Sequence, residues 1–367
     1  MRVGIFTAYA DRLEVSRAEL IAAMLAEGNT IIAIGPEPDP KRTDSNIFYH
    51  QVEIGRANTN PLKELITLKR LAKELHALKM DILLVYGARM AASVLPVAGF
   101  AGIKRRLCVI NGAGGHYYLA GARGVLVRMM SWPMMKLGLS GAKCIFFQNE
   151  DDRALYRKQH LVRLAKTKIL GGSGVNMDRF PCTPLPETQS FLMLTRLASD
   201  KGIGEYIEAA RQVKATYPEA EFHLVGQTDI SFPEAEKQLL DAAIAQQVIH
   251  YHGGTSDPAA WYQKCRYFVC ASYHEGTPRT VLEALSTGRP VLTTDAPGCR
   301  DTIVDGVSGI LVPVRSVVAL AEKMRYMMAH PQEMQRMADA AVKRVEEKYE
   351  VNRVNREILD EVFRKWE

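Results

Sequence analysis

The stretch Glu275-Gly-Thr-Pro-Arg-Thr-Val-Leu-Glu283 places two carboxylates eight residues apart across a junction between a loop and a predicted helix. Thr277 is the expected N-cap, Pro278 the expected first helical residue, and Gly288 the expected end of the helix. The free N–H groups of a helix's first turn bind anions such as phosphate. A carboxylate beside a phosphate is suited to accept hydrogen bonds from ribose or sugar hydroxyls instead. Phosphate and polyol recognised side by side predict a nucleotide-sugar site.

The length and composition of the chain indicate a soluble protein of two domains. It has 367 residues, of which 47% are hydrophobic and 24% charged, and this length exceeds the usual size of a single core. The six cysteines include no C-x-x-C pair and lie mostly in or beside apolar runs, so they are expected to be buried thiols and not metal ligands. Residues 1–7 predict a strand and not a signal peptide, and no apolar run is long enough to span a membrane.

Apolar, strand-like runs alternate with helical patterns twice along the chain, on either side of a Gly- and Pro-rich segment at residues 171–186. This alternation predicts an α/β protein with two Rossmann-like, doubly wound parallel sheets and a ligand crevice at the carboxyl ends of their strands. The expected domains are residues 1–172, residues 173–345 and a C-terminal helix over 346–367 that packs back on the first domain. The expected strands are Val3–Thr7, Thr30–Ile34, Asp81–Tyr86, Leu107–Asn111, Cys144–Gln148, Lys168–Leu170, Phe191–Thr195, Glu221–Val225, Val248–Tyr251, Tyr267–Ala271, Val291–Thr294 and Gly309–Val312.

Residues 275–283 resemble the E-x7-E signature of the GT4 family of retaining glycosyltransferases, which have the two-domain GT-B fold. Three further segments resemble motifs of the same family: Thr195-Arg-Leu-Ala-Ser-Asp-Lys-Gly202, Leu224-Val-Gly-Gln227 and Gly172-Ser-Gly-Val-Asn176. An Arg and a Lys on a strand-to-helix loop can converge on a diphosphate. The resemblance therefore implies a nucleotide-sugar donor bound in the C-terminal half.

The resemblance also implies roles for individual residues. The catalytic residues would be Glu275, which binds sugar hydroxyls, together with His116, Arg196 and Lys201. The donor would be bound by Arg196, Lys201, Gly226, Gly276, Thr277, Pro278 and Glu283, with Glu283 at the ribose hydroxyls. No metal or other cofactor is implied, and the sequence has no Asp-x-Asp motif after a strand near these residues. The leaving diphosphate would be stabilised by the cations and by the helix N-terminus, since such groups commonly give the largest catalytic contribution.

The N-terminal half resembles a narrower group. Asn111-Gly-Ala-Gly-Gly115 and Phe147-Gln-Asn-Glu-Asp-Asp152 are similar to segments of bacterial GT4 enzymes that extend sugars linked to undecaprenyl diphosphate, such as N-acetylgalactosaminyltransferases. His116 follows the glycine loop, where many relatives have a histidine against the sugar, although a packed loop residue is equally compatible with its neighbours Tyr117 and Tyr118. The chain departs from the family's Gly-Gly loop after the first strand, where it has Ala8-Tyr-Ala-Asp-Arg12.

Basic residues are concentrated in one part of the chain. Between Lys104 and Lys168, the chain has thirteen Lys and Arg residues and only three Asp and Glu residues. The segment 124–138 mixes Met, Leu and Trp132 with Arg128 and Lys136, and Arg123 precedes it. This composition is typical of a helix in a bilayer interface above anionic lipids, and an internal helix with a basic face is the alternative. No nucleic-acid motif accompanies the basic residues, so nucleic acid is not an expected partner.

These features predict a retaining glycosyltransferase that moves a hexose or N-acetylhexosamine from a UDP-sugar to a polyprenyl-diphosphate-linked saccharide. Its expected location is the inner face of the cytoplasmic membrane, as a peripheral protein. Two alternatives remain open: a nucleotide-sugar 2-epimerase, which needs no acceptor, and a non-catalytic nucleotide-binding module. Dinucleotide binding is disfavoured because no G-x-G-x-x-G follows the first strand.

Overall fold

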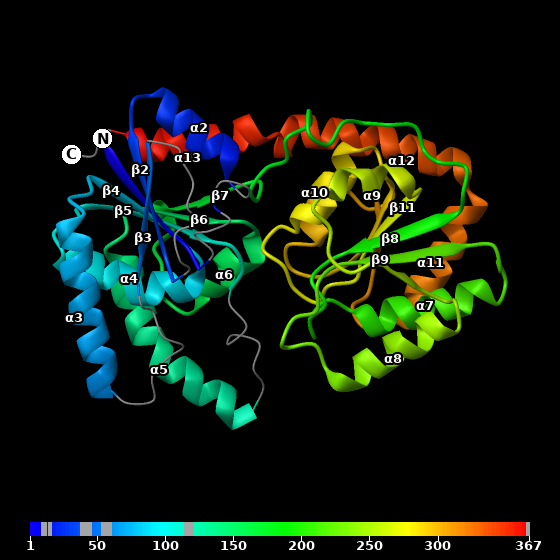
Figure 1. Ribbon diagram of the computed structural model, residues 1–367, viewed down its shortest axis with the longest axis horizontal. Helices are drawn as coiled ribbons and strands as arrows, with labels where there is room; N and C mark the ends of the chain where they lie inside the picture. Colours follow the sequence, from blue (N-terminus) through cyan, green and yellow to red (C-terminus); the bar gives the residue numbers. More distant parts are fainter. Residues whose placement is uncertain (9–12, 14–16, 37–45, 53–60, 114–120, 365–367) are drawn as a thin grey trace. The chain divides into compact units, whose positions relative to one another are not determined.

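The structure, a computed structural model, forms two compact units (Figure 1). It describes residues 1–367 except 9–12, 14–16, 37–45, 53–60, 114–120 and 365–367. Unit 1 comprises Met1–Ser173 and Val354–Glu367, and unit 2 comprises Gly174–Arg353. Each unit is built around one parallel sheet with helices in the crossovers, so the expected pair of doubly wound α/β domains is confirmed.

Unit 1 contains a seven-stranded sheet in the order β3-β2-β1-β4-β5-β6-β7. Its strands are β1 (Arg2–Phe6), β2 (Thr30–Gly35), β3 (Ile47–Gln51), β4 (Ile82–Tyr86), β5 (Arg105–Ile110), β6 (Cys144–Phe147) and β7 (Thr167–Ile169). Its helices are α2 (Ala18–Ala26), α3 (Pro61–Ala77), α4 (Ala88–Phe100), α5 (Gly121–Ser140), α6 (Glu150–Lys158) and most of α13 (Val351–Phe363). Among the sheet strands, β3 is absent from the expected set, because its residues are half-exposed at the sheet edge and do not form an apolar run.

Both faces of this sheet are buried, because alternate residues of its strands belong to different hydrophobic clusters. In β4, Ile82, Leu84 and Tyr86 belong to one hydrophobic cluster, whereas Leu83 and Val85 belong to another. Alternate side chains of a strand point to opposite faces, so a continuous apolar run requires cover on both sides. On one face this cover comes from α2 and α13, which lie side by side in Figure 1.

Unit 2 contains a six-stranded parallel sheet in the order β10-β9-β8-β11-β12-β13. Its strands are β8 (Ser190–Leu194), β9 (Glu221–Val225), β10 (His250–Tyr251), β11 (Tyr267–Cys270), β12 (Val291–Thr294) and β13 (Ile310–Val312). Its helices are α7 (Ile203–Lys214), α8 (Glu234–Ala245), α9 (Pro258–Lys264), α10 (Arg279–Ser286), α11 (Val317–Ala329) and α12 (Pro331–Arg344). The strand order changes direction between β8 and β11, which is where doubly wound sheets bind ligands, at the carboxyl ends of the strands.

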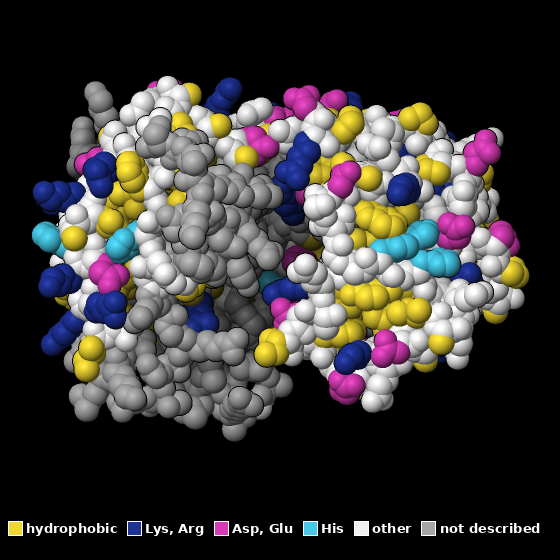
Figure 2. All heavy atoms as spheres, in the orientation of Figure 1, with side chains coloured by type: hydrophobic (Ala, Val, Ile, Leu, Met, Phe, Trp, Pro, Cys, Tyr) yellow, Lys and Arg dark blue, Asp and Glu magenta, His cyan; other side chains and the backbone are white. Residues whose placement is uncertain are grey.

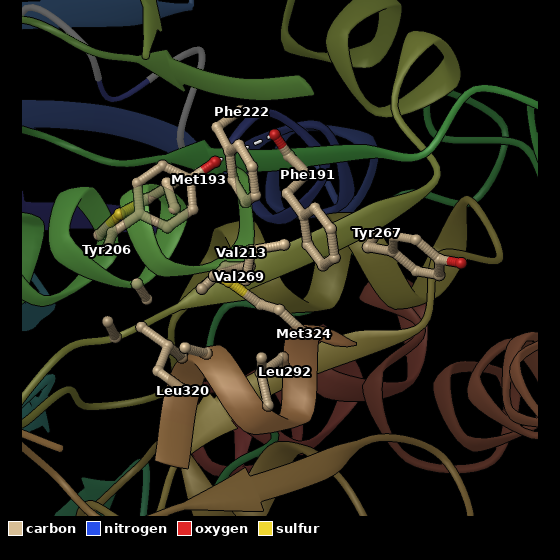
Figure 3. Close-up of a cluster of buried hydrophobic side chains, with 14 of the residues drawn as sticks. Phe191, Met193, Tyr206, Val213, Phe222, Tyr267, Val269, Leu292, Leu320 and Met324 are labelled. Carbon is tan, nitrogen blue, oxygen red and sulfur yellow. Dashed lines mark hydrogen bonds between the residues drawn. The ribbon is translucent and has the colours of Figure 1, made fainter. Parts of the chain in front are cut away.

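An aromatic cluster fills one face of this sheet (Figure 3). The rings of Phe191 and Phe222 are stacked with centroids 5.2 Å apart, and Tyr267 lies 4.8 Å from Phe191. Leu192, the neighbour of Phe191 in β8, belongs to the cluster on the opposite face. The buried side chains on both faces hold β8 and β11 together as adjacent central strands. The loops that carry the candidate site leave the carboxyl ends of these two strands.

Helix α10 differs from the expectation at its first residue. It begins at Arg279, and Pro278 is its N-cap with φ −66° and ψ 113°, so Thr277 is not the N-cap. Pro278 has the φ of a helix but an extended ψ, and the N–H groups of Val281 and Leu282 both donate to its carbonyl. The helix ends as expected, since Gly288 follows the C-cap Thr287 with φ +73°.

Candidate active site

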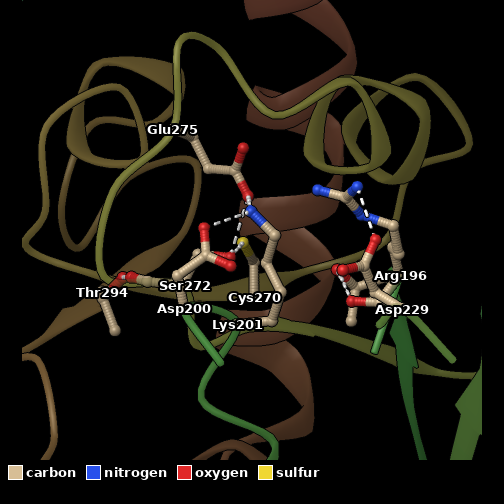
Figure 4. A network of polar contacts seen from close by, with 9 residues as sticks. Arg196, Asp200, Lys201, Asp229, Cys270, Ser272, Glu275 and Thr294 are labelled. Atoms are coloured by element: carbon tan, nitrogen blue, oxygen red, sulfur yellow. Dashed lines mark hydrogen bonds and ion pairs between the residues drawn. The ribbon is translucent and has the colours of Figure 1, made fainter. Parts of the chain in front are cut away.

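A polar network lies at the carboxyl ends of β8, β11 and β12 in unit 2 (Figure 4). At its centre, Lys201 Nζ donates to Glu275 Oε1 at 2.7 Å and to Asp200 Oδ2 at 3.0 Å. Lys201 is 8% exposed. Its burial acts to lower the pKa of the ammonium, but Glu275 and Asp200 outweigh this effect and raise the pKa above its ordinary value. Lys201 is therefore protonated at neutral pH and stands beside the predicted sugar-binding carboxylate.

Glu275 is fixed by the loop that follows β11. Ser272 Oγ donates to Glu275 Oε1 at 3.0 Å, so this oxygen accepts from a hydroxyl and from the ammonium of Lys201. The backbone N–H of Glu275 donates to the carbonyl of Pro297 at 3.0 Å, and Thr294 Oγ1 donates to the carbonyl of Ser272. Since the side chain of Glu275 is 23% exposed, the carboxylate is held in place and can still reach a ligand.

Two glycines allow the backbone of the site to pack this closely. A Cβ on Gly298, whose φ is +77°, would stand 2.2 Å from the carbonyl oxygen of Glu275 and 2.3 Å from that of Gly276. A Cβ on Gly202, whose φ is +67°, would stand 2.3 Å from the carbonyl oxygen of Ala271. Gly202 is also the N-cap of α7. Only glycine is compatible with both the left-handed conformation and the close approach, so these positions set the geometry of Lys201 and Glu275.

Arg196 follows β8 and forms the second cationic part of the network. Its Nη1 donates to Asp229 Oδ2 at 2.9 Å, and its side chain is 55% exposed. In Figure 4 the guanidinium of Arg196 and the ammonium of Lys201 point toward the same region of the network. Gly226, at φ +154°, permits the loop after β9 to lie against Arg196's loop, since a Cβ there would be 1.7 Å from the Thr195 carbonyl oxygen.

Glu283 lies inside α10 and is 5% exposed. Tyr262 Oη donates to Glu283 Oε2 at 2.9 Å, and Arg279 Nε donates to Oε1 at 2.9 Å. Burial raises the pKa of the Glu283 carboxyl, an effect that Arg279 and Tyr262 oppose. The role of Glu283 at ribose hydroxyls stays a prediction. The Arg279 contact follows the i, i+4 spacing of a helix and could have been expected from the sequence. The Tyr262 contact joins two helices, α9 and α10, and no local sequence pattern predicts it.

The remaining predicted donor residues lie on the same loops. Gly276 and Thr277 connect Glu275 to Pro278 at the start of α10, and Gly226 directly follows β9. The structure thus brings the predicted donor residues to one edge of one sheet. Asp200, Ser272, Asp229 and Tyr262 are the partners that sequence reasoning missed.

The candidate residues of the N-terminal half lie in unit 1. His116 falls outside the described residues, and positions 123 and 128 are on α5, where the description covers the backbone. Lys136 is exposed, whereas Trp132 is half-buried against the core. Met135 is 1% exposed and packs in the buried cluster that includes residues of α4. For this residue of the segment 124–138, the expectation of an interfacial position is therefore wrong. Among the described side chains of α5, the large apolar ones that are exposed include Val125, Met129, Met134 and Leu137.

None of the helices described combines the length and the hydrophobicity that crossing a bilayer requires. No group of three or more His, Cys, Asp or Glu residues in the described ranges is arranged to hold a metal ion.

Comparisons with known proteins relate this chain to glycosyltransferases. Residues 180–344 match the family model described as glycosyl transferases group 1. The N,N'-diacetylbacillosaminyl-diphospho-undecaprenol alpha-1,3-N-acetylgalactosaminyltransferase of Campylobacter jejuni is 26% identical over 344 residues, 89% of each chain. The capsular polysaccharide biosynthesis glycosyltransferase CapM of Staphylococcus aureus is 28% identical over 156 residues, 42% of this chain and 40% of its own.

Solved structures match over nearly the whole chain. A glycosyltransferase from Rickettsia africae superposes with a TM-score of 0.77 at 20% identity and covers 99% of both chains. Sucrose-phosphate synthase from Thermosynechococcus elongatus superposes with a TM-score of 0.77 at 18% identity and 98% coverage of both. These matches show that the chain has the GT-B fold.

Proposed function

We propose that this chain, a glycosyltransferase whose residues 180–344 form a glycosyl transferases group 1 domain, transfers a sugar from a UDP-sugar to a lipid-linked saccharide. The observation that carries the proposal is the contact of Lys201 Nζ with Glu275 Oε1 at 2.7 Å. It places a charged ammonium next to a carboxylate at the carboxyl ends of the central strands, where phosphate and sugar would meet.

Each group of the network has a part in this reaction. The bond between the anomeric carbon and the donor diphosphate breaks, and negative charge accumulates on the leaving phosphate. Lys201, Arg196 and the first turn of α10 would stabilise that charge, which lowers the barrier more than equal binding of donor and transition state would. Glu275 would hold the sugar hydroxyls, and Glu283 those of the ribose. The transfer would retain the anomeric configuration, with the leaving phosphate accepting the proton of the acceptor hydroxyl.

The proposed acceptor is a saccharide on undecaprenyl diphosphate, and the donor sugar is a hexose or N-acetylhexosamine. Support comes from the name of the Campylobacter jejuni relative, which acts on a diphospho-undecaprenol and transfers N-acetylgalactosamine. An acceptor with a polyprenyl chain stays in the bilayer, so the enzyme would act as a peripheral protein on the cytoplasmic face of the membrane. His116 would lie near the sugar, and Arg123, Arg128, Trp132 and Lys136 near the acceptor or the membrane.

The test is a panel of UDP-sugars incubated with a polyprenyl-diphosphate-linked saccharide, with and without excess EDTA. We expect one UDP-sugar to give a lengthened lipid-linked product and free UDP, and the rate to survive EDTA because Arg196 and Lys201 meet the phosphate charge. Turnover of a UDP-sugar without any acceptor would favour a 2-epimerase instead. A strict requirement for Mg²⁺ or Mn²⁺ would contradict the roles given to Arg196 and Lys201.

A further inference from the structure

Backbone hydrogen bonds position the ion pair between Arg196 and Asp229. Beyond the ends of β8 and β9, the two loops continue the parallel ladder: the N–H of Leu197 donates to the Gln227 carbonyl and the N–H of Asp229 to the Leu197 carbonyl, both at 2.9 Å. This ladder pairs Leu197 with Thr228, so it holds the backbones of Arg196 and Asp229 close enough for their side chains to form the ion pair.

The carboxylate of Asp229 is itself oriented. The backbone N–H of Ser231 donates to Oδ1 at 2.8 Å, while Oδ2 accepts from Arg196. Hydrogen bonds from Ser231, together with Arg196, lower the pKa of Asp229, so the group is ionised at neutral pH. In the part of the chain that the structure describes, Asp229 is the hydrogen-bonded partner of the Arg196 side chain.

The two cations of the network each have carboxylate partners. Two cations, Arg196 and Lys201, contact three carboxylates, those of Asp229, Asp200 and Glu275. Lys201 is buried between its two acids, whereas Arg196 is 55% exposed and Asp229 is 21% exposed. An incoming diphosphate would therefore meet Arg196 and Lys201 with carboxylates already beside them. The exposed pair is the one that can open at least cost, because an exposed ion pair contributes little and is screened by solvent.

We propose that Asp229 acts as an exchangeable counter-ion of Arg196, which the diphosphate of the nucleotide displaces, so that this carboxylate limits how tightly the product nucleotide is held. The inference rests on the proposed function of the site. Asp229 and the diphosphate compete for one guanidinium, and Arg196 binds phosphate only when its pair with Asp229 opens. A site with two uncompensated cations would retain the released diphosphate more tightly, and turnover requires that it leave.

The experiment measures the dissociation constant of UDP by titration calorimetry at low ionic strength, with the full chain. Asp229→Asn keeps an oxygen for the Ser231 N–H and removes the charge opposite Arg196. We expect it to bind UDP roughly two- to fivefold more tightly than the unmodified protein, the range that an exposed ion pair contributes. Arg196→Ala should bind UDP more weakly, and Asp229→Asn in the Arg196→Ala background should bring no further gain.

Glu208→Gln is the matched control. Glu208 accepts from Arg211 Nη1 at 2.8 Å in a half-exposed pair on α7, and its loss should leave the dissociation constant unchanged. Equal or weaker binding by Asp229→Asn, or the same gain in both Arg196 backgrounds, would overturn the exchange. If the unmodified protein does not bind UDP at all, both the proposed donor class and the proposed displacement of Asp229 by the diphosphate are refuted.

Discussion

At the scale of single residues, Lys201 and Glu275 depend on each other, because their contact at 2.7 Å is the shorter of the two ion pairs that Lys201 forms. We expect Glu275→Ala and Lys201→Ala each to lower the rate of sugar transfer by on the order of a hundredfold or more, since each removes an electrostatic contact with the reacting groups. Initial rates at saturating donor measure the loss. Circular dichroism and thermal unfolding serve as the control for folding, and a variant that keeps most of its turnover would refute the assigned role.

Gly298 and Gly306 form a natural pair for testing the backbone of the site. Both have a positive φ, +77° and +71°, but a Cβ at Gly298 would meet the Glu275 and Gly276 carbonyls, whereas at Gly306 nothing lies within 4 Å. Alanine costs about 1–2 kcal/mol of backbone strain at either position. We expect only Gly298→Ala to displace Glu275 and lower the transfer rate, by tenfold or more. Similar rates for the two variants would show that the approach of Gly298 to Glu275 has no catalytic consequence.

At the scale of elements, α5 is the helix whose surface predicts membrane association. It exposes Val125, Met129 and Leu137, with Met129 67% exposed, and Lys136 is exposed beside them. Each basic residue near an anionic surface contributes about 1 kcal/mol, less at high salt. We expect co-sedimentation with anionic vesicles that weakens at high salt and on charge reversal at Lys136 together with Arg123 and Arg128. Equal binding to neutral vesicles, or none to either kind, would make a soluble acceptor the better interpretation.

The edge formed by β9 and β10 carries a histidine cluster, and Figure 2 shows histidine side chains gathered on the surface of unit 2. His223 Nδ1 lies 3.1 Å from His252 Nε2, and His223 Nε2 lies 3.2 Å from Glu221 Oε2. Burial lowers the pKa of both imidazoles, although Glu221 opposes this for His223; His250 and Lys264 add to it for both. A hydrogen bond between two imidazoles also requires one unprotonated acceptor, so protonating both rings would break it.

The sign of the pH dependence follows from these lowered pKa values. Below about pH 6.5, the ordinary value for histidine, the unfolded chain binds more protons than the folded one, so stability falls as the pH falls. We expect up to about 1 kcal/mol lost per pH unit, mostly from His223 because solvent screens the exposed His252. Urea denaturation between pH 7.5 and 5.5 measures it, and His223→Gln should flatten the profile. A stability that rises on acidification would contradict this assignment.

At the scale of the whole molecule, the last helix returns to unit 1 and completes its core. Ile358 is 3% exposed, Val362 is 0% exposed, and both pack in the cluster that contains Val3 and Ile5 of β1. We expect Ile358→Ala to lower the free energy of unfolding of unit 1 by about 2–5 kcal/mol, the cost of a buried large-to-small change. Faster amide hydrogen exchange in β1 and β4 would report it, and Arg356→Ala, at an exposed position of α13, is the control. Faster exchange confined to unit 2 would contradict the assignment of α13.

The sequence by itself determined the fold class, most strands and the loops that carry the predicted donor residues, because these depend on local patterns. Apolar runs of strand length, amphipathic helices and glycines at turns recur within a few residues of one another, and parallel strands necessarily bring their carboxyl ends to one edge. Arg196, Lys201 and Glu275 could be placed at that edge from their positions after strands. The edge strand β3 was missed because a half-exposed strand lacks a continuous apolar run.

Only the tertiary structure decided which side chains meet. Lys201 and Glu275 are 74 residues apart in sequence, Arg196 and Asp229 are 33 apart, and Tyr262 and Glu283 are 21 apart. No local periodicity connects such residues; they meet because strand order and close approaches at Gly202, Gly226 and Gly298 bring their loops together. The exact start of α10 was also settled by packing, since propensity leaves it open.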